Sequence, residues 1–251
     1  MAGSVAAVFE RGDVIRRVDG EAVLLLGGPR AVLMQLAHPS VAAGVADHSE
    51  FRTDTFGRLR RTLEVTTTIV FGTDEQAAVA AAALKAVHDR VTGPGYRAND
   101  PDLLLWVHAT LVDTALRVHR RFLAPLSPTD EERYYQQSMR LAEAFGVPLS
   151  LQPPDLAAFR DYVRTMVGSL EVTDRAREVA QSVLHPRLPL VAEPFAEVGR
   201  QLTFGLLPPP LRRQFGYSWD RRRAAALNVA ALTSRRVLPL VPAPLRRSLA
   251  A

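Results

Sequence analysis

A histidine in the middle of an apolar helical stretch is the residue best suited to chemistry. His108 lies within residues 103–122, LLLWVHATLVDTALRVHRRF. At 100° per residue, its side of the predicted helix is mainly apolar and also carries His119. The opposite side carries charged residues, namely Asp113, Arg117, Arg120 and Arg121. A buried imidazole needs a partner for its ring nitrogens, either a carbonyl, a carboxylate or a metal. The pattern therefore predicts a core-facing histidine that is a hydrogen-bonded structural residue or a metal ligand.

A second unusual stretch, residues 56–71 with the sequence FGRLRRTLEVTTTIVF, places arginines on an apolar helix face. Arg58, Arg61 and Thr62 fall on the same side as Val65 and Ile69. A guanidinium facing a core needs an anion or several acceptors, because an unpaired buried charge costs several kcal/mol. Such a pair could bind propionates, a phosphate or a polar intermediate. The alternative is that both arginines reach the rim of the core or pair with acids of a neighbouring helix.

The remaining histidines offer a different chemistry. His38 directly precedes a proline, which predicts a helix junction, and His48 lies near a helix end, where we expect it to bind a backbone carbonyl. His88 and Asp89 are adjacent, with histidines upstream and Asp113 downstream. That order is typical of the all-α HD-domain metal phosphohydrolases. His38 or His48, with His88, Asp89 and Asp113, would then hold the metal.

The elements that must position these side chains are all predicted to be helices. Helical periodicity, caps and stops recur throughout, and no alternating strand pattern is bounded by hairpin turns. We expect a single all-α, multi-helix globular domain over residues 1–251. Capping boxes are predicted at Thr73 with Gln76 and at Thr129 with Glu132. The expected helices are 22–37, with a kink at 27–29, then 40–48, 55–71, 73–92 closed by Gly93, 103–122, 129–146, 155–170, 173–186, 191–207 and 218–237.

Composition narrows the choice of cofactors and partners. The chain has no cysteine, which excludes thiolate-bound iron, iron–sulfur clusters and covalent c-type haem. The net charge is +5, but the basic residues are scattered and only 7% of residues are aromatic, so we expect no nucleic-acid partner. No signal peptide or membrane-spanning stretch is indicated, which predicts a cytoplasmic protein. Peripheral membrane contact and the oligomeric state are left open.

Several blocks of the sequence together resemble a known family. These blocks are QLAHPSVAAGVADHSEF, RLRRT, FGTDEQA and VHDRVTGPGYRANDPDLLLWVHATLVDT, followed by an arginine-rich helix near Trp219. They resemble the haem-dependent oxygenase domain shared by latex-clearing proteins (rubber oxygenases) and MpaB-type oxygenases, over residues 10–240. The resemblance implies an all-α fold that holds non-covalent haem b, with His108 as the proximal iron ligand. It also implies that the distal Arg-x-x-Lys/Arg-Thr motif corresponds to Arg58, Arg61 and Thr62.

The expected function is therefore haem b-dependent oxygenation of a small apolar substrate by dioxygen, with cleavage of an isoprenoid double bond as one candidate. His38, Arg61 and Thr62 would line the distal side of the haem iron, and Arg58 would bind a propionate or the haem rim. The rubber-cleaving branch has lysine at the position of Arg61 and an acidic base upstream, so polyisoprene is not the expected substrate. The alternatives are an HD-like metal phosphohydrolase and a haem-binding protein without turnover.

Overall fold

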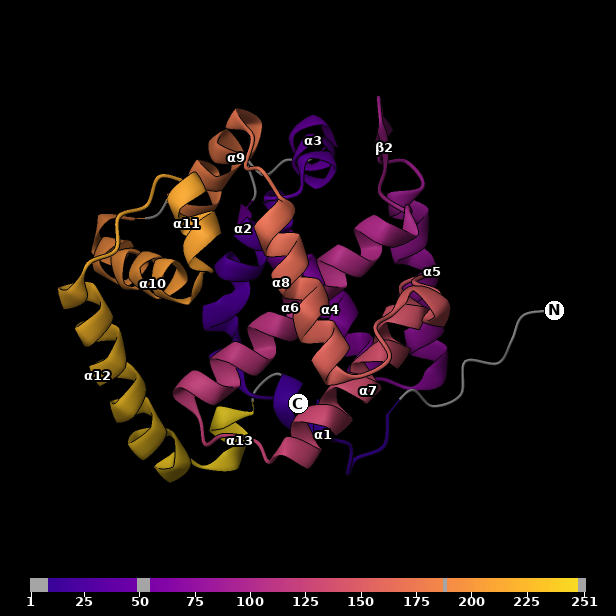
Figure 1. Ribbon diagram of the computed structural model, residues 1–251. Coiled ribbons are helices and arrows are strands. Elements are labelled where there is room, and N and C mark those ends of the chain that lie inside the picture. Colours follow the sequence, from indigo (N-terminus) through magenta and orange to yellow (C-terminus); the bar gives the residue numbers. More distant parts are fainter. Residues whose placement is uncertain (1–8, 49–54, 187–188, 248–251) are drawn as a thin grey trace.

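A long central helix, α6 (Pro101–Phe122), organises the fold. The structure is a computed structural model that describes residues 9–48, 55–186 and 189–247. In Figure 1, α6 crosses the middle of the molecule, and α2, α7, α8 and α12 all pack against it. The 3-10 helix η1 (Ala22–Gly27) also lies along α6. The chain is a single all-α domain, as the sequence predicted.

The other helices follow the predicted segments closely. Those before α6 are α1 (Val14–Asp19), α2 (Gly28–Leu36), α3 (Pro39–His48), α4 (Thr55–Phe71) and α5 (Asp74–His88). Those after it are α7 (Pro128–Ala144), α8 (Leu156–Ser169), α9 (Asp174–Leu184), α10 (Glu193–Leu206), α11 (Pro209–Gln214), α12 (Arg221–Val237) and α13 (Ala243–Arg246). Short 3-10 turns are η3 (Leu149–Leu151), η4 (Leu190–Ala192) and η5 (Leu238–Leu240). The short helices α1, α11 and α13 were not predicted.

Side-chain caps set the starts of six α-helices in the described residues, namely α5, α6, α7, α8, α9 and α12. The capping box at Thr73 is confirmed, since its side chain and that of Gln76 each accept a backbone hydrogen bond from the other residue. The box predicted at Thr129 is wrong. Ser127 caps α7 instead, and its hydroxyl accepts from the Asp130 N–H at 3.1 Å. The reason is Pro128, which has no N–H to satisfy and takes the first helical position, so the cap falls directly before it.

The segment after α5 forms a small hairpin that the sequence analysis missed. Gly93 was expected to close a helix, but α5 ends at His88. Strands β1 (Thr92–Gly93) and β2 (Tyr96–Arg97) then pair antiparallel. The turn between them is Pro-Gly, and Gly95 has a φ of +79°, a conformation that favours glycine. The buried Tyr96 ring packs so closely on Gly93 that a β-carbon there would lie 2.6 Å from the tyrosine oxygen.

Other helices cover both sides of α6, the apolar side and the side on which the sequence places charged residues. The Arg30 guanidinium of α2 donates to Asp113, and Gln35 Nε2 donates to Thr110 Oγ1 at 3.1 Å. The end of η1 approaches α6 closely at Gly27, where a β-carbon would lie 2.4 Å from a methyl of Thr114. Further along, α12 crosses the C-terminal turns of α6, as the Ser234 hydroxyl donates to the Phe122 carbonyl at 2.9 Å.

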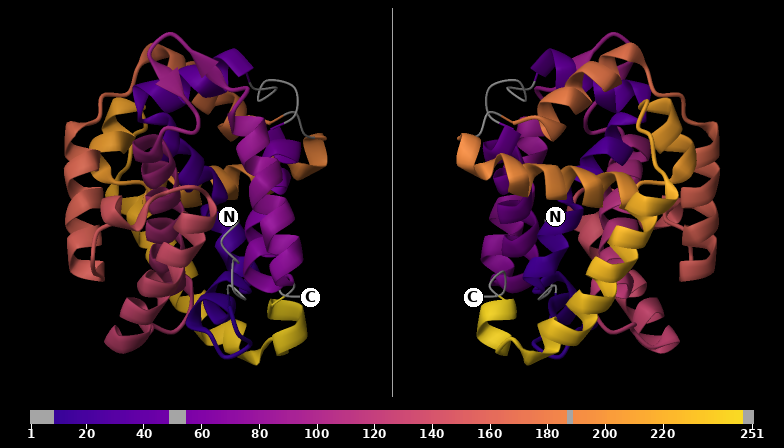
Figure 2. Two further views of the ribbon diagram at one scale, coloured as in Figure 1. Left: turned by 90° about the vertical axis from the view of Figure 1, so that its right-hand side faces the viewer. Right: turned by 90° about the vertical axis from the view of Figure 1, so that its left-hand side faces the viewer.

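The outer face of the C-terminal third is formed by α10 and α12. Figure 2, in its right-hand view, shows these two helices in orange and yellow at the front of the molecule. They contact each other, and α10 also packs against η1. None of the helices within the described ranges has the length and hydrophobicity of a membrane span.

Candidate functional site

His108 is buried in the core without a hydrogen-bond partner for its ring. The residue is 5% exposed, and neither Nδ1 nor Nε2 forms a hydrogen bond of ordinary geometry. Burial lowers the pKa of His108 to about 4, although the backbone of Ser138 in α7 acts in the opposite direction. The Phe145 ring lies edge-on with its centroid 6.4 Å from that of the imidazole. The ring is therefore neutral at neutral pH and keeps an unshared lone pair.

This environment fits an axial haem ligand. Such a ligand needs a neutral imidazole with one free lone pair, while its other nitrogen commonly donates to a carbonyl or a carboxylate. His108 satisfies the first requirement, and the backbone of Ser138 is placed to meet the second. The alternative of a structural histidine with both nitrogens hydrogen-bonded is not what the structure shows. His108 lies near the middle of α6, so the surrounding helices fix its position.

His119 is the second buried histidine of α6, but it belongs to a different environment. It is 8% exposed, and its Nδ1 also has no hydrogen-bond partner. Burial lowers its pKa to about 4, and charges of Arg17, Glu131 and Arg246 act on it. An α-helix rises about 1.5 Å per residue, so the two histidines are about 16 Å apart along the axis. They cannot bind the same metal ion.

The residues predicted for the distal side occupy the first half of α4. Arg61 and Thr62 are exposed, so the expectation that Arg61 faces the core is wrong. The side chain of Arg58 lies outside the described part of the chain. Helix α4 packs on α5 and α1, and its fully buried side chains are those near its end, Ile69 and Val70. Periodicity identified an apolar side of this helix, and among the described side chains of residues 61–71 it is fully buried only at Ile69 and Val70.

His38 lies at the junction between α2 and α3, as predicted. Its Nδ1 accepts a hydrogen bond from the Ser40 N–H at 3.2 Å. Burial lowers its pKa, while the charge of Asp100, at the start of α6, raises it. Helix α2 runs along the side of α6 that bears Thr110, about 200° around the axis from His108. The grouping of His38 with Arg58, Arg61 and Thr62 on the distal side of a haem stays a prediction.

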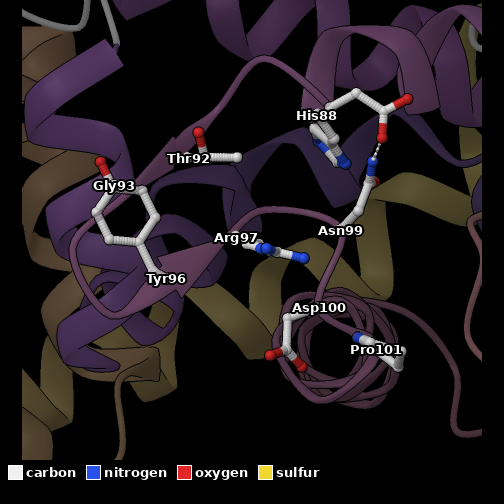
Figure 3. Close-up of a pocket in the computed structure, with 9 residues that line it drawn as sticks. His88, Thr92, Gly93, Tyr96, Arg97, Asn99, Asp100 and Pro101 are labelled. Atoms are coloured by element: carbon white, nitrogen blue, oxygen red, sulfur yellow. Dashed lines mark hydrogen bonds between the residues drawn. The ribbon is translucent and has the colours of Figure 1, made fainter.

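The His88–Asp89 pair lines a pocket between the end of α5, the hairpin and the start of α6. Figure 3 shows this pocket, which has a volume of about 720 Å³, with Arg97 and Asn99 on its wall. Asp89 accepts hydrogen bonds from Asn99 at 2.6 Å and from Lys85 at 3.1 Å, and these bonds lower its pKa. The carboxylate is therefore already occupied by protein donors.

The other residues of the HD-like alternative are dispersed. His48 Nε2 lies 2.8 Å from the Thr92 carbonyl oxygen, in line with its expected carbonyl contact, and Asp113 pairs with Arg30 on another side of the molecule. Across the residues that the structure describes, no three His, Asp or Glu side chains gather as a metal-binding group. A two-metal phosphohydrolase centre is thus not formed within that part of the chain.

Two polar groups were not identified from the sequence, the fully buried Arg30 and the half-buried Asp19. Arg30 is 0% exposed and donates to the Leu206 carbonyl at 2.8 Å as well as to Asp113 at 2.5 Å. Asp19, at the end of α1, accepts from the Tyr134 hydroxyl at 2.8 Å, and burial raises its pKa to about 7. The signal for Arg30 was its position as a lone charge in the apolar run 22–37. Asp19 had no comparable signal.

Comparison with known proteins gives one family match. The family described as "ER-bound oxygenase mpaB/B'/Rubber oxygenase, catalytic domain" matches residues 15–236. Two mycobacterial proteins, uncharacterized protein Mb2261 of Mycobacterium bovis and uncharacterized protein Rv2237 of Mycobacterium tuberculosis, are each 31% identical over 222 residues. Each alignment covers 81% of this chain and 86% of the relative. No solved structure matches the chain.

Proposed function

Because the chain belongs to the family of mpaB and rubber oxygenase catalytic domains, we propose that it is a haem b-dependent oxygenase with His108 as the axial iron ligand. Its substrates in this proposal are dioxygen and a small apolar molecule, for which an isoprenoid double bond is one candidate. The observation that carries the proposal is the His108 ring, which is buried and neutral and, among the described residues, has only the backbone of Ser138 placed near it as a hydrogen-bond partner.

In the proposed reaction, the protein would hold the cofactor through His108 and shape the site through the residues around it. Haem b, when bound, supplies the activation of oxygen, and the absence of cysteine requires its attachment to be non-covalent. His108 would hold the iron, and its lowered pKa keeps the ligating nitrogen unprotonated well below neutral pH. The core cluster around this part of α6 includes Ala109, Val112 and Met139, which exclude water and favour an apolar ligand.

The distal side of the proposal rests on the sequence motif and not on burial. The motif RLRRT assigns Arg58, Arg61 and Thr62 to that side. Arg61 has no free lone pair and can only donate hydrogen bonds, whereas the Thr62 hydroxyl can donate and accept. Arg58 is suited to a propionate because a guanidinium binds carboxylates through two parallel hydrogen bonds. His38 would line the distal side as well, with its Nδ1 accepting a hydrogen bond from the Ser40 N–H.

The first test is titration of the purified full-length chain with haem b, followed by its Soret absorption. We expect a saturable Soret shift, and extraction of the haem by acid-acetone. His108→Ala should abolish haem retention, whereas the matched control His119→Ala should retain it, since both replace a buried histidine of α6. Retention in His108→Ala together with loss in His119→Ala would overturn the ligand assignment.

Two further measurements separate the other functions. A haem-free protein that holds two divalent metal ions per chain would indicate the HD-like phosphohydrolase. A protein that binds haem but consumes no dioxygen with apolar substrates would be a binding protein without turnover. Oxygen uptake that depends on both haem and an isoprenoid substrate supports the oxygenase.

A further inference from the structure

Four guanidinium groups gather on the side of α6 that faces away from His108. They are Arg30 of α2, Arg117 and Arg121 of α6, and Arg235 of α12, and we call them the arginine cluster. Arg30 is fully buried and the other three are half-buried. Arg117 and Arg121 are four residues apart, which places them on one side of the helix. Helix α12 is seen at the front of the right-hand view in Figure 2. Its Arg235 donates to the backbone carbonyl of Arg120 and so lies against the C-terminal part of α6.

The positive charge of this cluster is poorly compensated. Asp113 forms an ion pair with Arg30 at 2.5 Å. In the described part of the chain, Arg117, Arg121 and Arg235 form no ion pair with a carboxylate. Arg121 donates to the side-chain oxygen of Asn228, and Arg235 to the carbonyl of Arg120, so both bind neutral acceptors. Three positive charges therefore remain once Asp113 and Arg30 are counted as a neutral pair.

The guanidinium groups are close enough to repel one another. Burial lowers the pKa of Arg121, and the charges of Arg235 and Arg117 lower it further. Burial likewise lowers the pKa of Arg30, with Arg117 adding to the effect against Asp113. Within the described ranges, the buried Nε atoms of Arg117 and Arg235 have no hydrogen-bond partner. A buried N–H donor without an acceptor is costly, and like charges in a half-buried place are screened less than at the surface.

We propose that the arginine cluster binds a phosphate group. A dianionic phosphate offers several acceptor oxygens to the unpaired N–H donors and offsets most of the uncompensated charge. The planar guanidinium fork matches phosphate geometry, and two arginines from α6 with one from α12 would approach it from two elements. The phosphate is that of a free small molecule or of a lipid headgroup, since both present the same chemistry.

This site is separate from the proposed haem site. Arg117 is nine residues after His108, which turns it about 180° around α6 and moves it about 14 Å along the axis. Helix α6 therefore stands between the arginine cluster and the His108 ring. A phosphate there would neither ligate the iron nor replace a propionate partner, so this inference does not depend on the proposed function.

The binding test uses the full chain in chloride buffer at constant ionic strength. Isothermal titration with inorganic phosphate should show saturable binding if the ligand is a free phosphate. Co-sedimentation with phosphatidic acid vesicles, compared with phosphatidylcholine vesicles, tests the lipid headgroup. Binding in either arm supports the site and identifies the source of the phosphate. Binding in neither arm overturns the proposal.

Variants then locate the binding. Arg117→Gln and Arg235→Gln should each weaken phosphate binding about tenfold or more, as expected when one charge-assisted contact is lost. Arg222→Gln is the matched control, because Arg222 also lies on α12 but is exposed. Unchanged affinity in Arg117→Gln, or equal weakening in Arg222→Gln, would show that the cluster is not the site.

A measurement on the wild-type chain covers the case in which a variant does not fold. Phenylglyoxal modifies accessible arginines, and mass spectrometry of peptides reports the rate at each position. Phosphate should slow the modification of Arg117 and Arg235 severalfold but leave that of Arg222 unchanged. Equal rates with and without phosphate at all three positions would contradict the proposal.

Discussion

Replacing Asp19 with asparagine should remove a specific pH dependence of stability. Asp19 ends α1 and accepts a hydrogen bond from the Tyr134 hydroxyl at 2.8 Å. Burial raises the pKa of its carboxyl from 3.8 to about 7, and the hydrogen bond from Tyr134 only partly opposes this. The native state therefore holds a proton on Asp19 over a pH range in which the unfolded state has already lost it. Asparagine has nearly the same shape, still accepts from Tyr134, and does not titrate.

The direction and size of this pH dependence of the free energy of unfolding follow from proton linkage. Because the native pKa is raised, the protonated form stabilises the fold at low pH, and this contribution is lost as pH rises from 3.8 through about 7. One pKa unit corresponds to about 1.4 kcal/mol, so the full contribution is about 4 kcal/mol. Between about pH 5 and pH 7 the wild type should lose roughly 2 kcal/mol relative to Asp19→Asn.

Urea denaturation of both proteins at several pH values measures this difference. His108 and His119, whose pKa values are lowered, weaken the fold as pH falls from 6.5 toward about 4. That effect is common to both proteins and cancels in the comparison. Tyr134→Phe removes the hydrogen bond that favours the carboxylate, so it should move the transition to higher pH. Parallel stability curves for wild type and Asp19→Asn would refute the reasoning.

Three further outcomes are expected. Gly27→Ala should destabilise the fold by about 1–3 kcal/mol in urea denaturation, since the new β-carbon would lie 2.4 Å from a Thr114 methyl, and unchanged stability would contradict that close approach. Arg30→Met should cost about 3 kcal/mol by leaving Asp113 unpaired, and adding Asp113→Asn should recover part of this loss; strictly additive losses would argue against the pair. The ferric haem protein should be high-spin in electron paramagnetic resonance and unchanged in His38→Ala, because the arginine of the distal motif has no free lone pair. A low-spin signal that disappears in His38→Ala would identify that histidine as a sixth ligand.

The sequence determined the features that depend on neighbouring residues. Helix starts at Thr73, Asp155 and Thr173 follow from side chains that accept backbone N–H groups within one turn. The side of the helix on which His108 lies follows from the helical spacing of the apolar residues around it. The kink after η1 and the junction at His38 follow from glycine and proline. Each of these is settled within a few residues, so a single sequence contains the information.

The sequence pattern predicted the wrong end of an element where two local preferences competed. Pro128 moved the cap of α7 from Thr129 to Ser127, although both residues can cap a helix. The Pro-Gly turn before Tyr96 was visible in the sequence, but strands of two residues are too short to show an alternating pattern. These errors changed the ends of elements and left the order of the helices intact.

Tertiary structure alone decided which helix faces are covered. Periodicity shows how residues are distributed around a helix axis, but it does not show what packs against each side. Among the described side chains of α4, Ile69 and Val70 are therefore buried while Arg61 is exposed, whereas the charged side of α6 lies beneath α2 and α12. The same packing brings Arg235 beside Arg121, more than a hundred residues earlier, and places Asp19 against Tyr134. Because desolvation and neighbouring charges set the pKa of each buried group, those properties arise only when distant segments meet.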